Sequence, residues 1–461
     1  MSNPTSPVRT PASPAKEAPR GTDQLAEAYE KSHPGSAAWY ARARGYFPAD
    51  GATHFARVRA PFRPYIARAQ GSRKWDVDGN VYIDYVMGHG ALVLGHGHPA
   101  VVEAVQAQAA RGIHYGDNHG LEVDWAERIR ALMPAAERIE YFASGQEANL
   151  MGLRVARAHT GRRRILKFKH NYHGWADELT GEGAAGAIAD LVTVIPAGDL
   201  GLVEKELASG QYAAVLIEGG GSRVAGRIPI EPSLYQGLPE LTRKYGAVLI
   251  LDEVVTGFRE SPGGWQAVVG ITPDLTTVGK AASGGLPSGI LLGRADILRV
   301  LSPESTVDRL VVHGGTWNAV PITCAAGIAA CDQYRGGEPQ RMAREAADAL
   351  RRQGNAAFER LGAPARLFGR SVVHIYLGAI DRVPSDDTQP PTLDPAKLMD
   401  PKRTATYKRL DLHLLHRGVS VLRGEALIVS AAHTRADVEA TAAALGESVK
   451  AMLDEGTLPP A

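Results

Sequence analysis

The stretch LILDEVVTGFRES, residues 249–261, ends a run of aliphatic residues on two carboxylates. A short aliphatic run is typical of a strand that a parallel sheet buries on both faces. Asp252 and Glu253 then fall at the carboxyl end of that strand, where such sheets bind their ligands. A buried carboxylate is costly unless a cation meets it, and two partners are open for Asp252: a salt bridge to Arg259 or the protonated ring nitrogen of a ligand.

The sequence around this stretch repeats one pattern of short strands separated by helices. From about Pro99 to Tyr334, helical patterns alternate with the aliphatic runs RIEYFAS, RILKFK, LVTVIP, AAVLIEG, AVLILDE, LTTVGK and GILLGR. Strands that alternate with helices are typical of βαβ units, in which helices cover both faces of the sheet. We therefore predict an α/β fold with a mainly parallel seven-stranded sheet covered by helices, plus a smaller α+β domain.

Changes in composition and in the hydrophobic pattern along the chain predict four segments. Residues 1–21 are rich in Pro, Ser and Ala and are predicted to form a disordered arm. Residues 22–98 contain a helix that runs to about Arg44 and a small antiparallel meander around the turn DVDGN. Residues 99–335 form the large domain that carries the sheet, and residues 336–461 form the small α+β domain.

Composition excludes several classes of partner. The chain has 461 residues, a formal charge of +1 and 22% charged residues, so it lacks the basic or acidic excess of proteins that bind nucleic acid or membrane surfaces. Cys324 and Cys331 lie in an apolar helical pattern, which favours small core residues in a reducing compartment over a disulfide. No apolar run approaches the roughly 18 residues of a membrane span, and no secretion signal is visible, so we expect a cytoplasmic protein.

Two further strand ends carry candidate ligand-binding groups. SGQEAN opens a helix directly after RIEYFA, where Ser144 Oγ and the amides of Gly145 and Gln146 can bind a phosphate. The alternative is an ordinary serine N-cap. HNYHGW follows RILKFK, where Tyr172 and His173 can cover a flat ring or simply fill space.

Lys280 ends a third strand, in LTTVGKAASGG. A desolvated lysine has a lowered pKa and becomes a nucleophile toward an aldehyde, whereas a surface lysine has no such role. Taken together, a phosphate cup, a ring-covering aromatic, an acid for a ring nitrogen and an imine-forming lysine are the parts that hold pyridoxal phosphate (PLP). We therefore predict pyridoxal 5'-phosphate as the cofactor.

The sequence resembles the class III aminotransferases, which are fold-type I PLP enzymes. It is most similar to the branch that contains glutamate-1-semialdehyde aminomutase and D-phenylglycine aminotransferase. The resemblance covers roughly residues 36–455. It is carried by WDVDGNVYIDYVMGHGALVLGHGHP, SGQEAN, YHGW, LDEVVTGFR, PDLTTVGKAASGGLPSG, GGTWNAVP and SAAHT.

The resemblance implies roles for the residues that match the family pattern. Lys280 would be the Schiff-base lysine that also carries the proton, Asp252 the partner of the pyridine nitrogen, and Tyr172 the aromatic on one ring face opposite Val254. Thr316 would reach the phosphate in the other subunit, which implies a homodimer with shared active sites. The implied cofactor site consists of Ser144, Gly145, Gln146, Tyr172, His173, Glu218, Asp252, Val254, Lys280 and Thr316.

The substrate side of the site is less fully specified. Arg57 matches the arginine that grips the substrate carboxylate, a role that suits a guanidinium fork, with Arg59 and Arg63 as rivals. His89 is expected to line the substrate pocket. The histidines that crowd GHGALVLGHGHP and GIHYGDNHG have one carboxylate among them, Asp117, and no cysteine, so no metal site is predicted.

Three departures from the family pattern surround the expected site. Gln146 replaces the threonine of the phosphate cup, which removes a hydroxyl but not the backbone amide. EGGGSR replaces the Glu-Pro turn, which should free the turn and bring Arg223 near the site. GTWNAVP keeps Thr316 but places Trp317 and Asn318 where glycine-rich backbone is expected.

The expected activity is amino transfer from an amino acid to a 2-oxo acid through Lys280 in two half-reactions. Arg423 is a guess for the arginine that handles the second substrate. An aminomutase or racemase with the same cofactor is the alternative, and a non-catalytic homologue is a third hypothesis. The expected partners are an amino donor and a 2-oxo acid, with no nucleic acid and no membrane.

Overall fold

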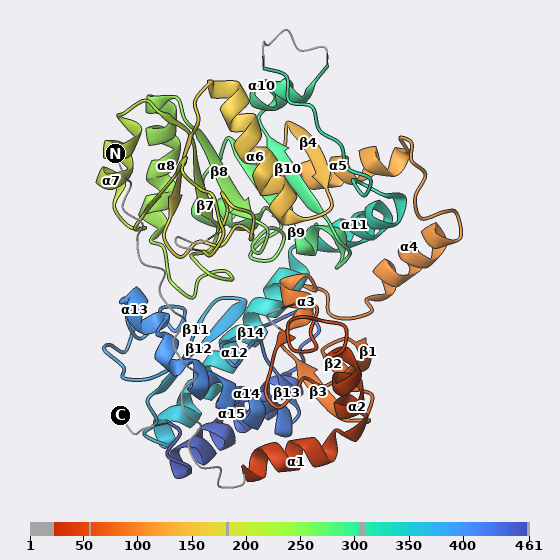
Figure 1. Ribbon diagram of the computed structural model, residues 1–461, viewed down its shortest axis with the longest axis vertical. Helices are drawn as coiled ribbons and strands as arrows, with labels where there is room; N and C mark the ends of the chain where they lie inside the picture. The colour runs from red at the N-terminus through yellow and green to blue at the C-terminus, as the bar shows by residue number, and fades with distance from the viewer. Residues whose placement is uncertain (1–22, 55–56, 181–183, 304–308, 459–461) are drawn as a thin grey trace, which may run out of the picture. The chain divides into compact units, whose positions relative to one another are not determined.

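The computed structural model describes residues 23–54, 57–180, 184–303 and 309–458 (Figure 1). The predicted disordered arm, residues 1–21, lies outside the described residues. The chain divides into two compact units, residues 1–64 and residues 65–461. The segment boundaries at residues 98 and 335 stay predictions.

Two helices occupy the first unit, α1 (Gln24–Ser32) and α2 (Pro34–Ala43). The prediction of one helix running to Arg44 is therefore wrong at residue 33. His33 precedes a proline, whose ring disfavours the α conformation of the preceding residue. His33 accordingly adopts φ −131° and ψ 47°, and Pro34 begins the second helix at a position where its missing N–H costs nothing.

The second unit contains the predicted seven-stranded sheet. All seven strand predictions are confirmed, and β10 is the single described strand that runs against the others. The parallel strands end together at one edge, which carries the candidate site. In spatial order the strands are β4 (Arg138–Phe142), β10 (Gly289–Gly293), β9 (Leu275–Gly279), β8 (Val248–Glu253), β7 (Tyr212–Glu218), β5 (Arg164–Phe168) and β6 (Val192–Ile195).

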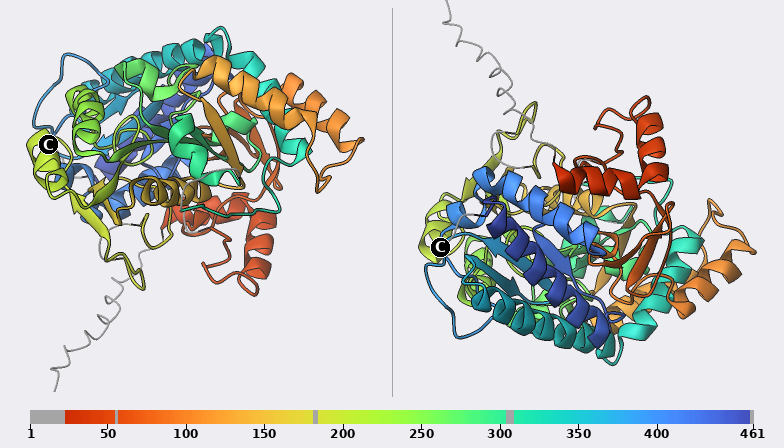
Figure 2. Two further views of the ribbon diagram at one scale, coloured as in Figure 1. Left: turned by 90° about the horizontal axis from the view of Figure 1, so that it is seen from above. Right: turned by 90° about the horizontal axis from the view of Figure 1, so that it is seen from below.

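Helices cover both faces of this sheet, as Figures 1 and 2 show. Because side chains alternate along a strand, Val248 and Ile250 pack in the same buried cluster as α6 (Gly145–Thr160). Leu249 and Leu251 point to the other face, toward α7 (Leu200–Leu207) and α8 (Pro232–Tyr245). This alternation determines toward which face of the sheet each polar side chain at a strand end points.

A third buried cluster lies beside β10 and includes Trp125, Cys324, Cys331 and Tyr334. Both cysteines are free thiols within this cluster. The remaining elements around the sheet are α4 (Pro99–Ala109), α5 (Gly120–Leu132), α9 (Gly264–Val269), η2 (Lys280–Ser283), α10 (Ala295–Leu298), η3 (Arg299–Leu301) and α11 (Pro321–Tyr334).

Two smaller sheets complete the second unit. The predicted meander is confirmed as β1 (Ile66–Gln70), β2 (Arg73–Asp76) and β3 (Val81–Asp84), which β13 (Val419–Ser420) joins in parallel. An antiparallel sheet consists of β11 (Ala365–Gly369), β12 (Val372–Leu377) and β14 (Ala426–Ile428). The other elements are α3 (Met87–Gly90), α12 (Glu338–Arg360), α13 (Pro395–Leu398), η4 (Pro401–Arg403), α14 (Thr404–His416) and α15 (Arg435–Asp454).

None of the helices in the described ranges combines the length and the apolar character that a membrane crossing requires.

Candidate active site

Strand alternation sends the two carboxylates of β8 to opposite faces of the sheet. Asp252 continues the face of Val248 and Ile250 and points toward α6. Glu253 points the other way, where it accepts hydrogen bonds from the backbone N–H of Gln266 at 3.0 Å and from Thr256 Oγ1 at 2.9 Å. Glu253 therefore holds the start of α9, and Asp252 is the carboxylate that enters the site.

Asp252 does not form a salt bridge to Arg259, which was one of its two possible interactions. Arg259 is fully buried and donates to the carbonyl oxygens of Val429 and Gly90, each at 2.9 Å. Asp252 is instead bound by an amide and an imidazole. Its Oδ2 accepts from Asn149 Nδ2 at 2.8 Å and pairs with His173 Nδ1 at 2.7 Å.

One acceptor position on Asp252 remains open. Oδ1 accepts the backbone N–H of Val254 at 3.0 Å, whereas Oδ2 already has two donors. Since each carboxylate oxygen has two lone pairs, Oδ1 can accept one more hydrogen bond. A buried carboxylate with a free lone pair at a sheet edge fits the protonated ring nitrogen of PLP.

Lys280 lies at the next strand end, directly after β9, and is partly buried. Gly90 lies beside its chain, because a Cβ added there would be in ordinary contact with Lys280 Cδ at 3.8 Å. Burial lowers the pKa of Lys280, and the carboxylates of Asp252 and Glu218 oppose that shift. The lowered pKa increases the share of neutral amine, which is the nucleophilic form.

Glu218 ends the strand on the other side of Asp252, with which it is in register. Its Oε2 accepts the backbone N–H groups of Tyr172 at 3.0 Å and Arg223 at 2.9 Å. Burial raises the pKa of Glu218 to about 8, and the charge of Asp252 adds to that shift. Burial therefore favours the protonated form of Glu218, which can donate a hydrogen bond.

The N-terminus of α6 carries the three residues that are predicted to form the phosphate cup. Ser144 is the N-cap, and its Oγ accepts the backbone N–H of Glu147 at 3.3 Å, so the N-cap interpretation holds in the structure. The N–H groups of Gly145 and Gln146 belong to the first helical turn, which has no acceptors within the helix. An anion can therefore bind here in addition to the cap.

Gly145 is required by close packing against Val254. A Cβ added to Gly145 would lie 2.6 Å from Val254 Cγ2 and 2.7 Å from Cγ1. The predicted phosphate residue and the predicted ring-facing residue are thus in direct contact.

Gln146 uses its side chain differently from a threonine hydroxyl. Its Oε1 accepts the backbone N–H groups of Trp175 at 2.6 Å and Ala176 at 3.1 Å. Gln146 therefore ties the start of α6 to the turn that carries Tyr172 and His173. Tyr172 is 58% exposed, whereas His173 is buried and its Nε2 has no hydrogen-bond partner among the described residues.

The EGGGSR turn is not free, which corrects the expectation from sequence. Ser222 and Ile228 pair across it, with N–H to carbonyl bonds of 2.9 and 3.2 Å. Arg223, Val224 and Ala225 then adopt φ values of 64°, 46° and 56°. Left-handed conformations cost roughly 1–2 kcal/mol per non-glycine residue, so the surrounding contacts must hold this turn in place.

Three predicted residues lie outside this group of contacts. Thr316 is exposed, and its carbonyl oxygen pairs with His114 Nε2 at 2.6 Å. Arg57 belongs to the unit of residues 1–64, where its Nη1 donates to Thr53 Oγ1 at 3.3 Å. His89 is partly buried and adjoins Gly90, the neighbour of Lys280. The roles of these three residues stay predictions.

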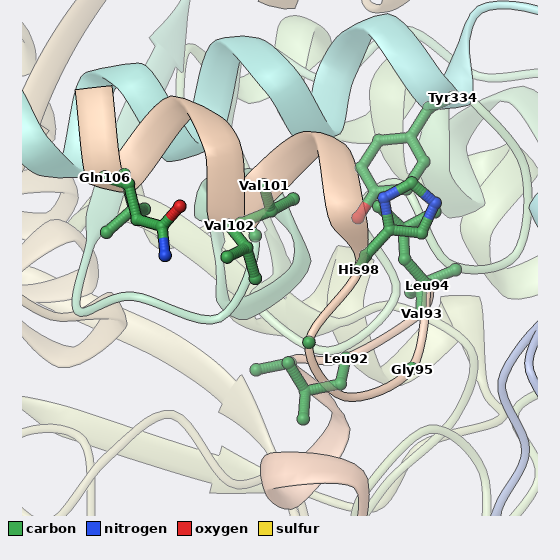
Figure 3. Close-up of a pocket in the computed structure, with 13 residues that line it drawn as sticks. Leu92, Val93, Leu94, Gly95, His98, Val101, Val102, Gln106 and Tyr334 are labelled. Atoms are coloured by element: carbon green, nitrogen blue, oxygen red, sulfur yellow. The ribbon is translucent and has the colours of Figure 1, made fainter. Parts of the chain in front are cut away.

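A cavity of about 200 Å³ lies between the segment of residues 91–106 and Tyr334 (Figure 3). It is lined mainly by apolar residues of segment 91–105, by His98 and by Tyr334. Tyr334 donates its hydroxyl to the carbonyl oxygen of Ala281 at 3.0 Å. The cavity therefore adjoins the turn that carries Lys280, and Asp252 is not among its lining residues.

Two residues of the site were missed in the sequence. Asn149 connects three elements, because it binds Asp252, the carbonyl oxygen of His173 at 3.0 Å and Thr277 Oγ1 at 2.6 Å. Thr277 shares its face of β9 with Leu275, toward α6. The sequence signal that could have revealed Asn149 is its amide, which lies on the otherwise apolar buried face of α6 about one turn after the N-cap.

The crowded histidines have partners of other kinds. His96 Nε2 pairs with Asp84 at 2.8 Å, and His119 Nε2 pairs with the carbonyl oxygen of Ala319 at 3.0 Å. Across the ranges that the structure describes, no group of His, Cys, Asp and Glu side chains could hold a metal ion.

Comparisons with known proteins show the family to which the chain belongs. The family model of class-III aminotransferases matches residues 55–185 and 198–360. The glutamate-1-semialdehyde 2,1-aminomutase of Desulforamulus reducens is 35% identical over 85% of this chain and 91% of its own. An ω-transaminase from Sphaerobacter thermophilus has a TM-score of 0.80 and 32% identity, with 90% of this chain and 97% of that chain covered.

A solved structure with bound cofactor is also similar. The PLP form of the Sphingopyxis sp. MTA144 FumI protein has a TM-score of 0.79 and 25% identity, with 92% of this chain and 98% of that chain covered. A seven-stranded sheet with a lysine and a carboxylate at adjacent strand ends defines a PLP-dependent enzyme of fold type I. The chain belongs to the class III aminotransferase family, and its cofactor is pyridoxal 5'-phosphate.

Proposed function

We propose that the protein is an aminotransferase that moves an amino group from an amino acid to a 2-oxo acid. The observation that carries this proposal is the convergence of Lys280, Asp252 and Glu218 at the ends of three neighbouring parallel strands. Bound PLP supplies an electron sink for the pair of electrons released at the substrate carbon. The other tasks fall to side chains of this chain.

The proposed tasks are divided among the residues at the strand ends. Asp252 Oδ1 would hold a proton on the ring nitrogen, while Asn149 and His173 fix the orientation of the carboxylate. Lys280 would hold the cofactor aldehyde, and its free amine would take a proton from the substrate carbon. Tyr172 and Val254 would enclose the ring, and Glu218 would donate a hydrogen bond to the oxygen beside it.

Ser144, Gly145 and Gln146 bind the phosphate at the start of α6, where unpaired N–H groups and the helix dipole both favour an anion. Arg57 orients the substrate carboxylate, and His89 lines the substrate pocket. Cys324 and Cys331 are buried free thiols, which fits the proposed cytoplasmic location.

We propose that the enzyme acts as a homodimer in which Thr316 completes the phosphate site of the other subunit. Thr316 is exposed, and so are its apolar neighbours Trp317 and Val312. Ile113 and Tyr115 are exposed on the adjoining segment, which shares a surface pocket with residues 315–321. Exposed apolar side chains that gather in this way are typical of a protein interface.

An aminomutase is the second candidate, because the similar protein of Desulforamulus reducens carries that name. An aminomutase returns the amino group to the molecule that gave it, so it needs no oxo-acid acceptor. The two candidates share Lys280, Asp252 and the phosphate cup, and they differ in whether the site must accept a second substrate.

One experiment separates these candidates. Amino donors of both the L and the D configuration, including aromatic D-amino acids, are screened with the cofactor-loaded protein. Pyruvate and 2-oxoglutarate serve as the amino acceptors. Amino transfer that requires an acceptor supports the aminotransferase. Conversion of a single amino compound without any acceptor overturns it in favour of the aminomutase. A protein that binds PLP but converts no donor in either format would support the non-catalytic homologue.

A further inference from the structure

Arg227, on the turn that follows β7, is a buried arginine whose guanidinium binds neutral oxygen atoms. The side chain is 5% exposed and makes four hydrogen bonds. Burying a cation is costly, and acceptors on several sides offset part of that cost by holding the guanidinium in one position. The acceptors are the carbonyl oxygens of Leu398 (3.0 Å from Nε), Ile375 (3.4 Å from Nη1) and Glu425 (3.3 Å from Nη1) and the hydroxyl of Tyr407 (3.0 Å from Nη2).

The four acceptors come from four segments between residues 372 and 428. Tyr407 is itself fixed, because its hydroxyl donates to the carbonyl oxygen of Ile375 at 3.2 Å and accepts the N–H of Leu377 at 3.2 Å. One side chain therefore ties the turn after β7 to the elements that surround the three-stranded sheet. The segments are β12, the end of α13, α14 and the residue that directly precedes β14.

The turn that carries Arg227 has a backbone that its surroundings must hold. Its three consecutive left-handed residues, 223–225, are of a kind that persists only where contacts enforce it. A Cβ added to Gly226 would lie 2.5 Å from the carbonyl oxygen of Gly220, so the two halves of the turn are closely packed. Arg227 contributes to this closure directly, because its N–H donates to the carbonyl oxygen of Arg223 at 3.3 Å.

The same turn supplies a hydrogen bond to the proposed active site. The N–H of Arg223 donates to Glu218 Oε2 at 2.9 Å, and the N–H of Tyr172 donates to the same oxygen at 3.0 Å. Arg227 is thus connected to the carboxyl of Glu218 through one residue, Arg223. An open turn would withdraw one of the two N–H groups that orient Glu218.

We propose that Arg227 is a positioning residue: its anchored guanidinium keeps the turn of residues 222–228 closed, so that the N–H of Arg223 stays on Glu218 beside the cofactor. This inference rests on the proposed function, because it assigns Glu218 to the cofactor site. Arg227 acts through Glu218 and does not itself touch the cofactor.

PLP affinity, measured by fluorescence titration, tests the proposal. Arg227→Lys keeps the charge but cannot reach four acceptors, and Arg227→Met removes the charge. Both should weaken PLP binding, the methionine variant by about 10-fold, the worth of one hydrogen bond, and the lysine variant by less. If Arg227→Met does not fold, Arg227→Lys carries the test, and PLP affinity equal to the wild type in a folded variant would overturn the proposal.

Arg162 offers a matched control at the opposite end of β7. Its Nη1 donates to the carbonyl oxygens of Tyr212, Tyr245 and Gly246 at 3.2, 2.6 and 2.9 Å. Tyr212 begins β7, whereas Glu218 ends it. Arg162→Lys and Arg162→Met should therefore change PLP affinity by less than about 3-fold. Losses equal to those of the Arg227 variants would show a general response to lost stability and would overturn the proposal.

Two further readouts separate positioning from a purely structural role. Hydrogen exchange in peptides of residues 219–228 should quicken about 10-fold in Arg227→Lys and stay unchanged in Arg162→Lys. In the Glu218→Ala background, Arg227→Met should weaken PLP binding by less than about 3-fold, because the group through which it acts is gone. A loss of the same size in both backgrounds would overturn the proposal.

The two levels of inference fail differently. If borohydride does not fix the cofactor to Lys280 in the wild type, the proposed function falls. If fixation is intact and the Arg227 variants bind PLP like the wild type, only the assignment of Arg227 falls.

Discussion

The contact between Gly145 and Val254 gives a quantitative prediction. In Gly145→Ala the new Cβ would lie 2.6 and 2.7 Å from the two methyl carbons of Val254, well inside an ordinary contact. Rotating the valine does not relieve the overlap, because both methyls are equally close. Overpacking of this kind costs about 1–3 kcal/mol, and alanine returns about 0.5–1 kcal/mol through its better helix propensity. We expect a net loss of about 1–2 kcal/mol.

Val254→Ala should abolish that loss. Without its methyls, the nearest Val254 atom to the new Cβ would be the Cβ of residue 254, at 3.3 Å. In the Val254→Ala background, Gly145→Ala should therefore be neutral or slightly stabilising, so its effect changes sign. The double-mutant cycle should give a coupling of about 1–3 kcal/mol.

Urea unfolding of the cofactor-free variants measures the cycle, and fluorescence titration with PLP measures cofactor affinity. Because the displaced Val254 is the residue that we propose faces the ring, Gly145→Ala should also weaken PLP binding by about 10-fold. The reasoning is refuted if Gly145→Ala matches the wild type in both assays, or if its penalty persists unchanged in the Val254→Ala background.

Three other substitutions test single contacts of the site. Asp252→Asn keeps the shape but loses the charge that we propose pairs with the ring nitrogen, an interaction worth about 4 kcal/mol. Turnover should therefore fall on the order of 1,000-fold while PLP still binds, and undiminished turnover would contradict this. Glu218→Gln removes a carboxyl whose pKa is raised to about 8 from 4.5. Between these two pH values the folded wild type keeps a proton on Glu218 that the unfolded chain loses, so the free energy of unfolding of the wild type should decline as the pH rises. By pH 8, urea unfolding should show the variant more stable relative to the wild type by up to about 5 kcal/mol. Parallel pH profiles of the two proteins would exclude the pKa shift. Gln146→Ala frees the N–H groups of Trp175 and Ala176, whose hydrogen exchange should quicken about 10-fold, whereas Gln146→Glu keeps the acceptor and the slow exchange.

The sheet and its strand ends could be predicted because their signals are local. Each aliphatic run is short, and each is followed by the polar residue that ends it, as in Leu251 followed by Asp252. The direction of Asp252 and Glu253 follows from strand alternation once the strand is known. The same reasoning found Lys280 and Ser144.

The rest depends on contacts between distant segments. Asn149 joins α6 to β8 and β9, and no local pattern distinguishes it from a buried amide that only fills space. Three consecutive glycines precede Ser222, and in the sequence they indicate a flexible backbone. In the structure, backbone hydrogen bonds between Ser222 and Ile228 hold this turn closed. The end of the first helix at His33 could have been predicted from the sequence, because a proline follows this residue.

The central claim is that the amine of Lys280 holds the cofactor beside Asp252. The cofactor-loaded protein is reduced with borohydride, digested, and mapped by peptide mass spectrometry, with Lys280→Ala as the control and the buried Lys167 as the internal comparison. The account predicts a pyridoxyl group on the peptide that contains Lys280 and none in the variant. A pyridoxyl group on another lysine, or no fixation in the wild type, would contradict it.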